Sequence, residues 1–302
     1  MSKSLNQQLK AHASNTATSK PNYRKALNSS QLQTLHLIYK FRFCSSQQIA
    51  TYFKKRSPKD VQKRLKILED QGLIAKRYDK SYKLRGKPAA YFLLPDGART
   101  VAKNRAEDKP INIKAIYRNK TVSEAFITHC LNIAWVYFTL KAVYAVNLRF
   151  FTQTDLNYDQ FDYFIRPLPD AYLSLTSGLN DDEQTRDFFL ETYEETTPYF
   201  VLLRRIKKYL SYAEDGDWAT TESDLPTILI ICETTSTQKR VRKRIARELR
   251  ATYEEMVFAT TTKEALRTAS KASDKIWRLV DEDEPQPEEV KLLPLTEIPL
   301  TP

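Results

Sequence analysis

The sequence predicts an α+β protein in which a winged helix-turn-helix domain is followed by a mixed α/β domain with a central sheet. Three observations predict this organisation. Three amphipathic helix patterns precede a hairpin pattern, short apolar strands then alternate with helices, and basic charge is concentrated early in the chain. A chain of 302 residues also exceeds the usual size of one domain, so two separate cores are expected.

Four segments are expected along the chain. Residues 1–28 are polar and lysine-containing without a hydrophobic period, which predicts a flexible basic arm. The winged-helix domain with its linker should occupy residues 29–120, and the α/β domain residues 121–280. Residues 281–302 are acidic and rich in proline, which predicts a disordered tail.

Start signals mark two of the three predicted helices. Ser45 followed by Gln48 fits a capping box, in which each side chain bonds to the backbone of the other residue. Ser57 is expected to cap the third helix, with Pro58 as its first helical residue. The predicted helices cover residues 32–43, 45–53 and 57–72.

After Gly72 the pattern changes to that of a β-hairpin. Residues 73–79 and 89–95 have strand character, and the connection between them, KSYKLRGKP, is basic. Asp96 then begins another short helix. Three helices followed by a hairpin form a winged helix-turn-helix.

The third helix and the hairpin carry the predicted DNA contacts. Val61, Leu65 and Leu68 share one helix face, so the opposite face can offer cations to phosphates and an amide to a base edge. The predicted contacts are Lys59, Gln62, Lys63 and Lys66 on the helix and Arg77, Lys80, Lys83, Arg85 and Lys87 on the hairpin. The alternative is that these are ordinary solvated side chains.

The charge distribution favours the DNA interpretation. The formal charge is +11, and residues 1–120 hold 27 Lys and Arg against 7 Asp and Glu. Residues 121–302 hold 21 Lys and Arg against 30 Asp and Glu. Because cations attract a polyanion and release its counterions, the predicted partner of the first domain is double-stranded DNA.

The second domain is predicted from alternating patterns after a linker at residues 104–120. A long helix at 122–144 is apolar on more than one face and must be buried. Its most apolar part, Leu131 to Val146, is too short to span a bilayer. Strands are expected at 145–153, 169–175, 187–193, 227–234, 256–261 and 275–280, and helices at 197–214 and 236–255.

Two acidic residues of the second domain are candidate metal ligands. Asp170 follows Pro169 at the start of one strand, and Glu191 lies on the next. Carboxylates on adjacent strands can hold a hard cation such as magnesium. A nuclease of the PD-(D/E)xK type has a lysine two residues beyond the glutamate, where this chain has Tyr193.

The order of these features resembles the replication-relaxation family of plasmid and mobile-element proteins. The resemblance covers about residues 30–260 and rests on the winged helix, His129 early in the long helix, and the segments PDAYLSL, FFLETYEET, IKKYLSY and PTILIICET. It implies a DNA-binding protein of plasmid replication, relaxation or mobilisation with a restriction-endonuclease-like second domain. Family members often show an aspartate two residues beyond the glutamate, followed by basic and glycine residues. This chain has Tyr193, Glu194 and Glu195 there.

We therefore predict a catalytically inactive second domain, without metal or cofactor, that serves dimer or partner contacts. In this interpretation Asp170 caps a strand end and Glu191 pairs with Lys207 or Lys208. The first alternative is a magnesium- or manganese-dependent nuclease in which Asp170 and Glu191 act with one of those lysines and Glu124 is an extra acid. The second is a transcriptional repressor whose C-terminal domain binds an effector.

Other residues carry weaker expectations. His129 is expected to be a satisfied core histidine. The cations Lys239, Arg240, Lys243, Arg247 and Arg250 lie along one helix surface. They form either a second DNA contact or the solvated face of a helix that packs Val241, Ile245 and Leu249 on the sheet.

The cysteines and the first residues predict the compartment. Cys44, Cys130 and Cys232 lie far apart without zinc spacing, so neither a disulfide framework nor a zinc site is expected. The polar N-terminus has no signal-peptide pattern. The predictions are a cytoplasmic protein, no membrane contact, and as partners double-stranded DNA, a plasmid replication or mobilisation protein and a second copy in a homodimer.

Overall fold

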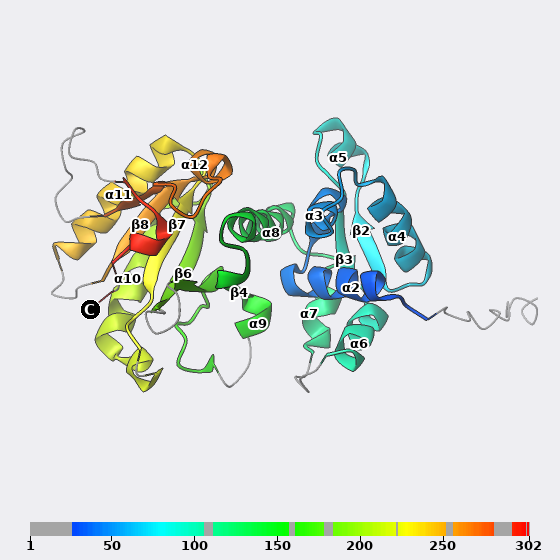
Figure 1. Cartoon of the computed structure of the whole chain (residues 1–302), viewed down its shortest axis with the longest axis horizontal. Helices are drawn as coiled ribbons and strands as arrows, with labels where there is room; N and C mark the ends of the chain where they lie inside the picture. Colours follow the sequence, from blue (N-terminus) through cyan, green and yellow to red (C-terminus); the bar gives the residue numbers. More distant parts are fainter. Residues whose placement is uncertain are drawn as a thin grey trace, which may run out of the picture.

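The computed structural model describes residues 26–105, 111–156, 161–177, 184–221, 223–251, 256–280, 292–299 and 301. Within them the chain forms a three-stranded sheet in the order β1-β3-β2 and a seven-stranded sheet in the order β10-β9-β8-β7-β6-β5-β4 (Figure 1). Helices flank both sheets, so the predicted α+β class is confirmed. The predicted basic arm lies outside the described residues up to position 25.

The N-terminal part has the element order of a winged helix-turn-helix. Strand β3 pairs antiparallel with both β1 and β2, and three helices pack on this small sheet. The elements are α2 (Ser29–Phe41), β1 (Cys44–Ser45), α3 (Ser46–Tyr52), α4 (Lys59–Asp70), β2 (Ile74–Arg77) and β3 (Ala90–Leu93). The three predicted helices and both hairpin strands are therefore confirmed.

Local capping explains where these helices begin. Asn28 and Gln31 form a capping box for α2, and the predicted box of Ser45 and Gln48 begins α3. The third helix begins one residue later than predicted. Pro58 is its N-cap, and the Ser57 hydroxyl accepts a hydrogen bond from the Lys59 amide at 3.3 Å.

The basic connection of the predicted hairpin contains a helical turn, α5 (Lys80–Leu84). Asp79 caps this turn by accepting hydrogen bonds from the amides of Ser81 and Tyr82. The Tyr82 ring is buried beneath it, and Gly86 leaves it at a φ of +62°. The cap and the buried ring favour a helix over an extended connection.

The predicted linker is partly folded onto the first domain. Helix α6 (Pro95–Lys103) is followed, after residues outside the described part, by α7 (Ile113–Arg118), which packs against it. Asn119 is buried and accepts hydrogen bonds from the Arg42 guanidinium at 2.7 and 3.2 Å. The end of the segment therefore belongs to the domain.

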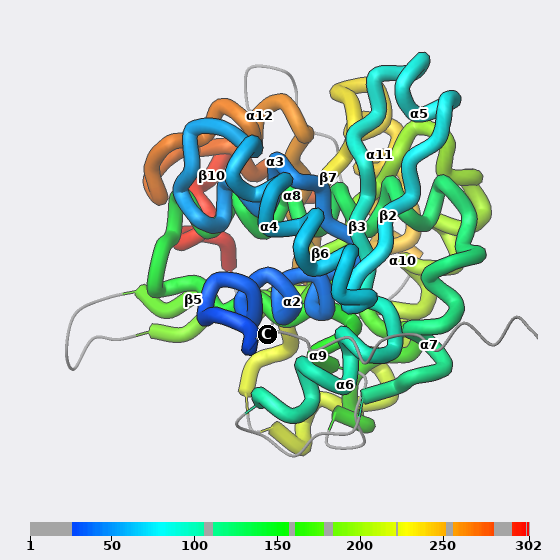
Figure 2. Tube along the Cα trace, turned by 90° about the vertical axis from the view of Figure 1, so that its right-hand side faces the viewer, coloured from blue at the N-terminus to red at the C-terminus, as the bar shows by residue number. Residues whose placement is uncertain are grey.

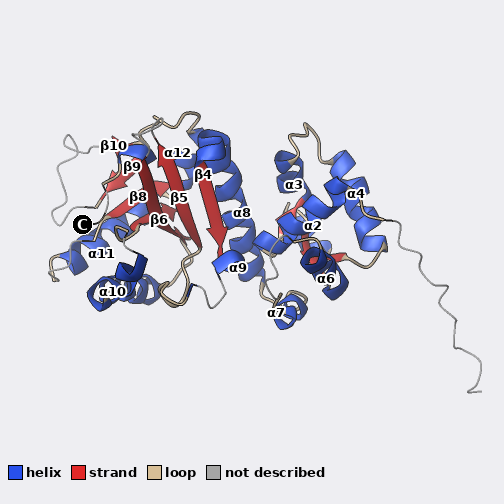
Figure 3. Ribbon diagram, turned by 60° about the horizontal axis from the view of Figure 1, so that its bottom comes forward, coloured by secondary structure: helices blue, strands red, loops and turns tan. Residues whose placement is uncertain are grey.

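The large sheet has a parallel centre and antiparallel edges. Strands β6, β7 and β8 are parallel, whereas β4, β5, β9 and β10 pair antiparallel with their neighbours (Figure 3). The strands are β4 (Leu148–Thr152), β5 (Ala171–Ser177), β6 (Gln184–Tyr193), β7 (Thr227–Cys232), β8 (Phe258–Thr262), β9 (Trp277–Leu279) and β10 (Leu292–Leu293). All six predicted strands are confirmed.

Helices cover the two faces of this sheet unequally. Helices α10 (Tyr199–Asp215) and α11 (Thr235–Leu249) are the crossovers of the parallel strands, and they share a core with Phe189, Ile228 and Ile230. Leu190, Leu229 and Ile231 point to the other face and share a core with α8 (Glu124–Tyr144) and the winged-helix domain. The sheet therefore separates α10 and α11 from the first domain.

The remaining short elements are α9 (Gln153–Leu156), α12 (Lys263–Thr268) and the 3-10 turns η1 (Ala145–Asn147), η4 (Asp217–Thr221) and η6 (Leu295–Glu297).

Helix α8 joins the two parts of the molecule (Figure 1). In the view from the side of the first domain, the elements of that domain lie in front of it (Figure 2). Helix α8 contacts α2, α3 and β1 on one side and β4 on the other, as predicted for a buried helix. By length and composition alone it is also sufficiently apolar to cross a membrane. A core helix meets the same criterion, and its Ala134, Val136 and Leu140 are completely buried.

The prediction of a disordered tail is wrong for the last described residues. Strand β10 pairs with β9, and Leu293, Leu295 and Ile298 are buried. Arg186 donates a hydrogen bond to the carbonyl of Ile298 at 2.6 Å. Apolar residues after the acidic run therefore anchor the end of the chain, whereas positions 281–291 lie outside the described residues.

Candidate functional site

Helix α4 presents the predicted polar face to solvent. Val61, Leu65 and Leu68 are completely buried, whereas the opposite positions Lys59, Gln62, Lys63 and Lys66 are all exposed. Lys66 forms an ion pair with Asp70 at 2.6 Å, one turn further along the helix. Lys59 and Lys63 form no ion pair within the described residues, so their charges are available to a ligand.

The turn before α4 extends this positive surface. From Lys54 to Lys66 the sequence contains seven Lys and Arg and one acid. Lys54, Lys55 and Arg56 are exposed between α3 and α4. Arg64 differs from the others because its guanidinium packs over the Phe53 ring at 4.3 Å. The helix-turn-helix therefore carries exposed cations both on α4 and on the turn before it.

Three predicted wing contacts are engaged within the protein. Arg85 and Lys87 each approach Glu124, the first residue of α8, at 3.1 Å. Arg77 donates hydrogen bonds to the carbonyls of Lys120 and Val122 at 2.9 and 3.2 Å. Glu124 is thus a wing contact and not an extra acid at the carboxylate site. Sequence reasoning missed this contact because residues 85 and 124 meet only after folding.

Lys80 and Lys83 remain the exposed cations of the wing helix. Neither forms an ion pair within the described part of the chain. The predicted interface is thereby reduced to the α4 face and these two lysines, with Arg85 and Lys87 held by Glu124.

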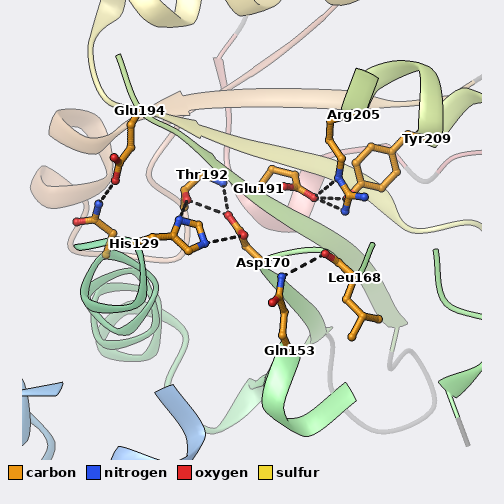
Figure 4. A network of polar contacts seen from close by, with 10 residues as sticks. His129, Gln153, Leu168, Asp170, Glu191, Thr192, Glu194, Arg205 and Tyr209 are labelled. Atoms are coloured by element: carbon orange, nitrogen blue, oxygen red, sulfur yellow. Dashed lines mark hydrogen bonds and ion pairs between the residues drawn. The ribbon is translucent and has the colours of Figure 1, made fainter. Parts of the chain in front are cut away.

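Asp170 and Glu191 lie side by side at one end of β5 and β6, as predicted (Figure 4). The antiparallel register pairs Ala171 with Leu190, which places the two acids on neighbouring positions. Their side chains are only 10% and 18% exposed, so each needs internal partners.

Asp170 is held by His129 and by the neighbouring strand. One oxygen lies 2.9 Å from His129 Nε2, and the other accepts hydrogen bonds from the amide and hydroxyl of Thr192 at 2.8 Å. Burial raises the pKa of Asp170. The hydrogen bond and charge of His129, together with the two bonds from Thr192, lower this pKa by more than burial raises it. The pKa is therefore below its usual 3.8. Asp170 thus joins β5 to β6 and α8 and does more than cap a strand end.

His129 is part of the carboxylate site and not an ordinary core histidine. Its side chain is 34% exposed. Burial lowers its pKa, but the hydrogen bond to Asp170 and the charges of Asp170, Glu194 and Glu191 raise it to about 8. The imidazole therefore carries a positive charge at pH 7.

Glu191 pairs with an arginine and a tyrosine, so the prediction of Lys207 or Lys208 is wrong. Arg205 Nε and Nη2 donate to Glu191 Oε1 at 2.8 and 2.5 Å, and the Tyr209 hydroxyl donates to the same oxygen at 2.5 Å. Burial lowers the pKa of Arg205, but the carboxylate outweighs burial and raises it, so the guanidinium remains charged.

Helical spacing explains the choice of partner. Arg205 and Tyr209 are four residues apart and share the inner face of α10 with Leu202 and Ile206. Lys207 is 63% exposed on the outer face, where it approaches Glu248 at 3.8 Å. The basic residue that pairs with Glu191 is therefore Arg205, two residues before the predicted Lys207.

The side chains present do not fit a divalent metal site. Both Asp170 oxygens are occupied by hydrogen-bond donors, and Arg205 places a positive charge against Glu191 where a cation would bind. Within the described residues no group of three or more His, Cys, Asp and Glu is arranged to hold a metal. The three cysteines are also separately buried. The site is an internal network of ion pairs.

The His129 network predicts a pH-dependent stability. A histidine whose pKa is raised by folding stabilises the folded state fully below its unfolded pKa of 6.5, and this contribution is lost as the pH rises through about 8. We expect His129→Asn to lower the free energy of unfolding more at about pH 6 than at about pH 9. Urea unfolding at both pH values tests this.

His36 provides the control for the pH experiment. Burial and then Arg105 lower its pKa, which is the opposite direction to His129. His36→Asn should therefore not produce the larger loss at the lower pH. An equal effect of His129→Asn at both pH values would contradict the ion pair with Asp170.

One comparison with known proteins, that with family sequence models, agrees with the sequence resemblance. The sequence model of the replication-relaxation family matches residues 35–228. A solved structure of Lactococcus lactis ZitR, a C30AH42A mutant, is 20% identical, with a TM-score of 0.24, and the match covers 39% of this chain and 79% of that chain. No curated protein matches the sequence.

Proposed function

The chain belongs to the replication-relaxation family, and from this premise we propose that it binds duplex DNA of a plasmid or other mobile element. The proposed role is in replication, relaxation or mobilisation, in the cytoplasm and together with a plasmid replication or mobilisation protein. The α4 face carries this proposal, because Lys59, Gln62 and Lys63 are exposed together on the third helix of a winged helix-turn-helix. In such domains this helix enters the major groove.

The cations and the amide of α4 have different roles in this proposal. Lys59 and Lys63 neutralise phosphates and position the helix, which supplies affinity without sequence information. Gln62 lies between them, and its amide can both donate to and accept from an adenine edge. Lys80 and Lys83 on the wing add phosphate contacts beside the groove.

Replacing Gln62 by alanine tests the assignment of base recognition. We expect the variant to lose about 1–3 kcal/mol of preference for a site enriched from a random duplex library, while its affinity for random duplex changes little. Competition binding at one salt concentration measures both. Lys59→Ala is the matched control, because it should weaken binding to both duplexes equally.

The second domain is proposed to be a catalytically inactive scaffold for a homodimer or partner contact. The pairing of Arg205 and Tyr209 with Glu191 supports this, because the carboxylate is already neutralised by the protein. Tyr193, at the position of the nuclease lysine, is buried and donates its hydroxyl to the carbonyl of Thr197 at 3.1 Å. A neutral phenol held in this way offers no charge to a phosphoryl group.

The nuclease alternative has a direct test. We expect supercoiled plasmid to remain uncut by the purified chain with magnesium or manganese. Nicking that disappears in both Asp170→Ala and Glu191→Ala, and also in Lys207→Ala or Lys208→Ala, would establish the enzyme. Lys103→Ala, an exposed lysine of the first domain, is the control for nonspecific loss of charge.

A further inference from the structure

The outer surface of α11 is strongly cationic. The helix contains six Lys and Arg and one acid, Glu248. Glu248 is already occupied by Arg244 at 2.6 Å and Lys207 at 3.8 Å. Val241, Ile245 and Leu249 are buried on the sheet as predicted, and the exposed cations are Lys239, Arg240, Lys243 and Arg247.

Three of these cations recur at a helical spacing. Lys239, Lys243 and Arg247 are spaced by four residues, so they line one side of α11 at intervals of about 6 Å. None of them forms an ion pair within the part of the chain that the structure describes. A row of unneutralised cations along a helix is suited to a chain of phosphates.

Two exposed aromatic rings lie at the start of α10, and one of them contacts α11. At the start of α10, Tyr199 is 46% exposed and Phe200 is 59% exposed. Arg244 of α11 donates a hydrogen bond to the Tyr199 hydroxyl at 2.9 Å, which fixes the ring against α11. Arg204 lies 5.9 Å from the Phe200 ring centroid and is itself exposed.

We propose that this α10–α11 surface binds single-stranded DNA. Exposed aromatic rings gain stacking energy from unpaired bases, and adjacent cations follow the phosphate backbone. A duplex offers the same phosphates but keeps its bases stacked and paired, so the rings would gain nothing from it. A second copy of the same surface would bring like charges together, which disfavours a symmetric dimer here.

This proposal goes beyond the duplex contact and does not depend on it. The inner face of α11 packs on the large sheet, and the other face of that sheet packs on α8 and the first domain. Helix α11 and helix α4 accordingly lie at opposite ends of the molecule (Figures 1 and 3). The chain can therefore hold a duplex at one end and a separated strand at the other.

Binding of the full chain to a labelled oligothymidylate tests the proposal through its salt dependence. Replacing Lys239, Lys243 and Arg247 by alanine should reduce the magnitude of the log-log salt slope by about 2, since each phosphate contact on a single strand contributes about 0.7. Affinity for a random duplex should not change. Alanine at Lys103, Lys271 and Lys275, three exposed lysines elsewhere, is the matched control.

Phe200 provides an independent readout of stacking. Phe200→Ala should weaken oligothymidylate binding by about tenfold and leave the salt slope unchanged, because a neutral ring releases no counterions. Tyr117→Ala removes a ring that is 53% exposed on α7 and should have no effect. In Phe200→Trp, the indole fluorescence should be quenched by oligothymidylate and not by duplex.

Several results would overturn the proposal. They are absence of oligothymidylate binding by the natural chain, equal competition by a random duplex, and tighter binding of oligouridylate RNA. A change of oligomeric state in Phe200→Ala without a change in strand binding would assign the surface to protein contacts instead. Any of these results leaves duplex binding by α4 intact, so the two proposals fail separately.

Discussion

Reversing the charges of Lys59 and Lys63 to glutamate should lower the affinity for duplex DNA on the order of a hundredfold. Both side chains are exposed on α4 without an internal ion pair, so each is available to one phosphate. The log-log salt slope should fall in magnitude by about 1.8, at about 0.9 per lost contact. Fluorescence anisotropy on a labelled random duplex over a range of salt concentrations measures both quantities.

The matched control reverses Lys103 and Lys114, which are exposed on α6 and α7 of the same domain. It changes the net charge equally and should alter duplex affinity far less, because these lysines lie outside α4 and the wing. If both variants lose the same affinity, binding depends on total charge, and the assignment to α4 is wrong.

The second large effect concerns stability. Arg205→Ala should lower the free energy of unfolding by about 3–5 kcal/mol, the usual cost of removing one partner from a buried ion pair. Glu191, which is 18% exposed in the natural chain, would keep only the Tyr209 hydroxyl as a donor among the described residues. The loss should exceed that of an exposed pair such as Lys66 with Asp70, which contributes at most about 1 kcal/mol. Urea unfolding measures the difference.

Two further variants isolate the ion pair from the loss of side-chain volume. Arg204→Ala removes the neighbouring exposed arginine and should cost little. The double change Glu191→Gln with Arg205→Met removes both charges and keeps most of the packing, so it should recover most of the stability. A double variant as unstable as Arg205→Ala would show that packing, and not charge, accounts for the loss.

Local patterns in the sequence determined most of the fold. The capping box at Ser45, the helix periods and the alternating strands depend on residues a few positions apart, so they could be predicted without the tertiary structure. The α4 face is predictable for the same reason. One buried side at Val61, Leu65 and Leu68 leaves the opposite side exposed.

The end of the chain was predicted less well because composition outweighed a short apolar signal. The acidic run predicted disorder, yet Leu293 and Ile298 fill the core beside β9. A two-residue strand has no usable period in the sequence, and its burial depends on an edge strand that is formed elsewhere.

The fold class and the pair of acids at Asp170 and Glu191 could be predicted from the sequence alone, whereas the two separate cores expected from chain length are joined in one cluster that includes Leu35, Leu140 and Leu190. The cations that pair with these two acids, and the acid that pairs with the wing, are specified only by the folded chain. Arg205, His129 and Glu124 lie between 14 and 41 residues from their partners. Ion-pair energy depends on distance and burial and not on sequence separation, so residue types and spacing alone do not specify these partners.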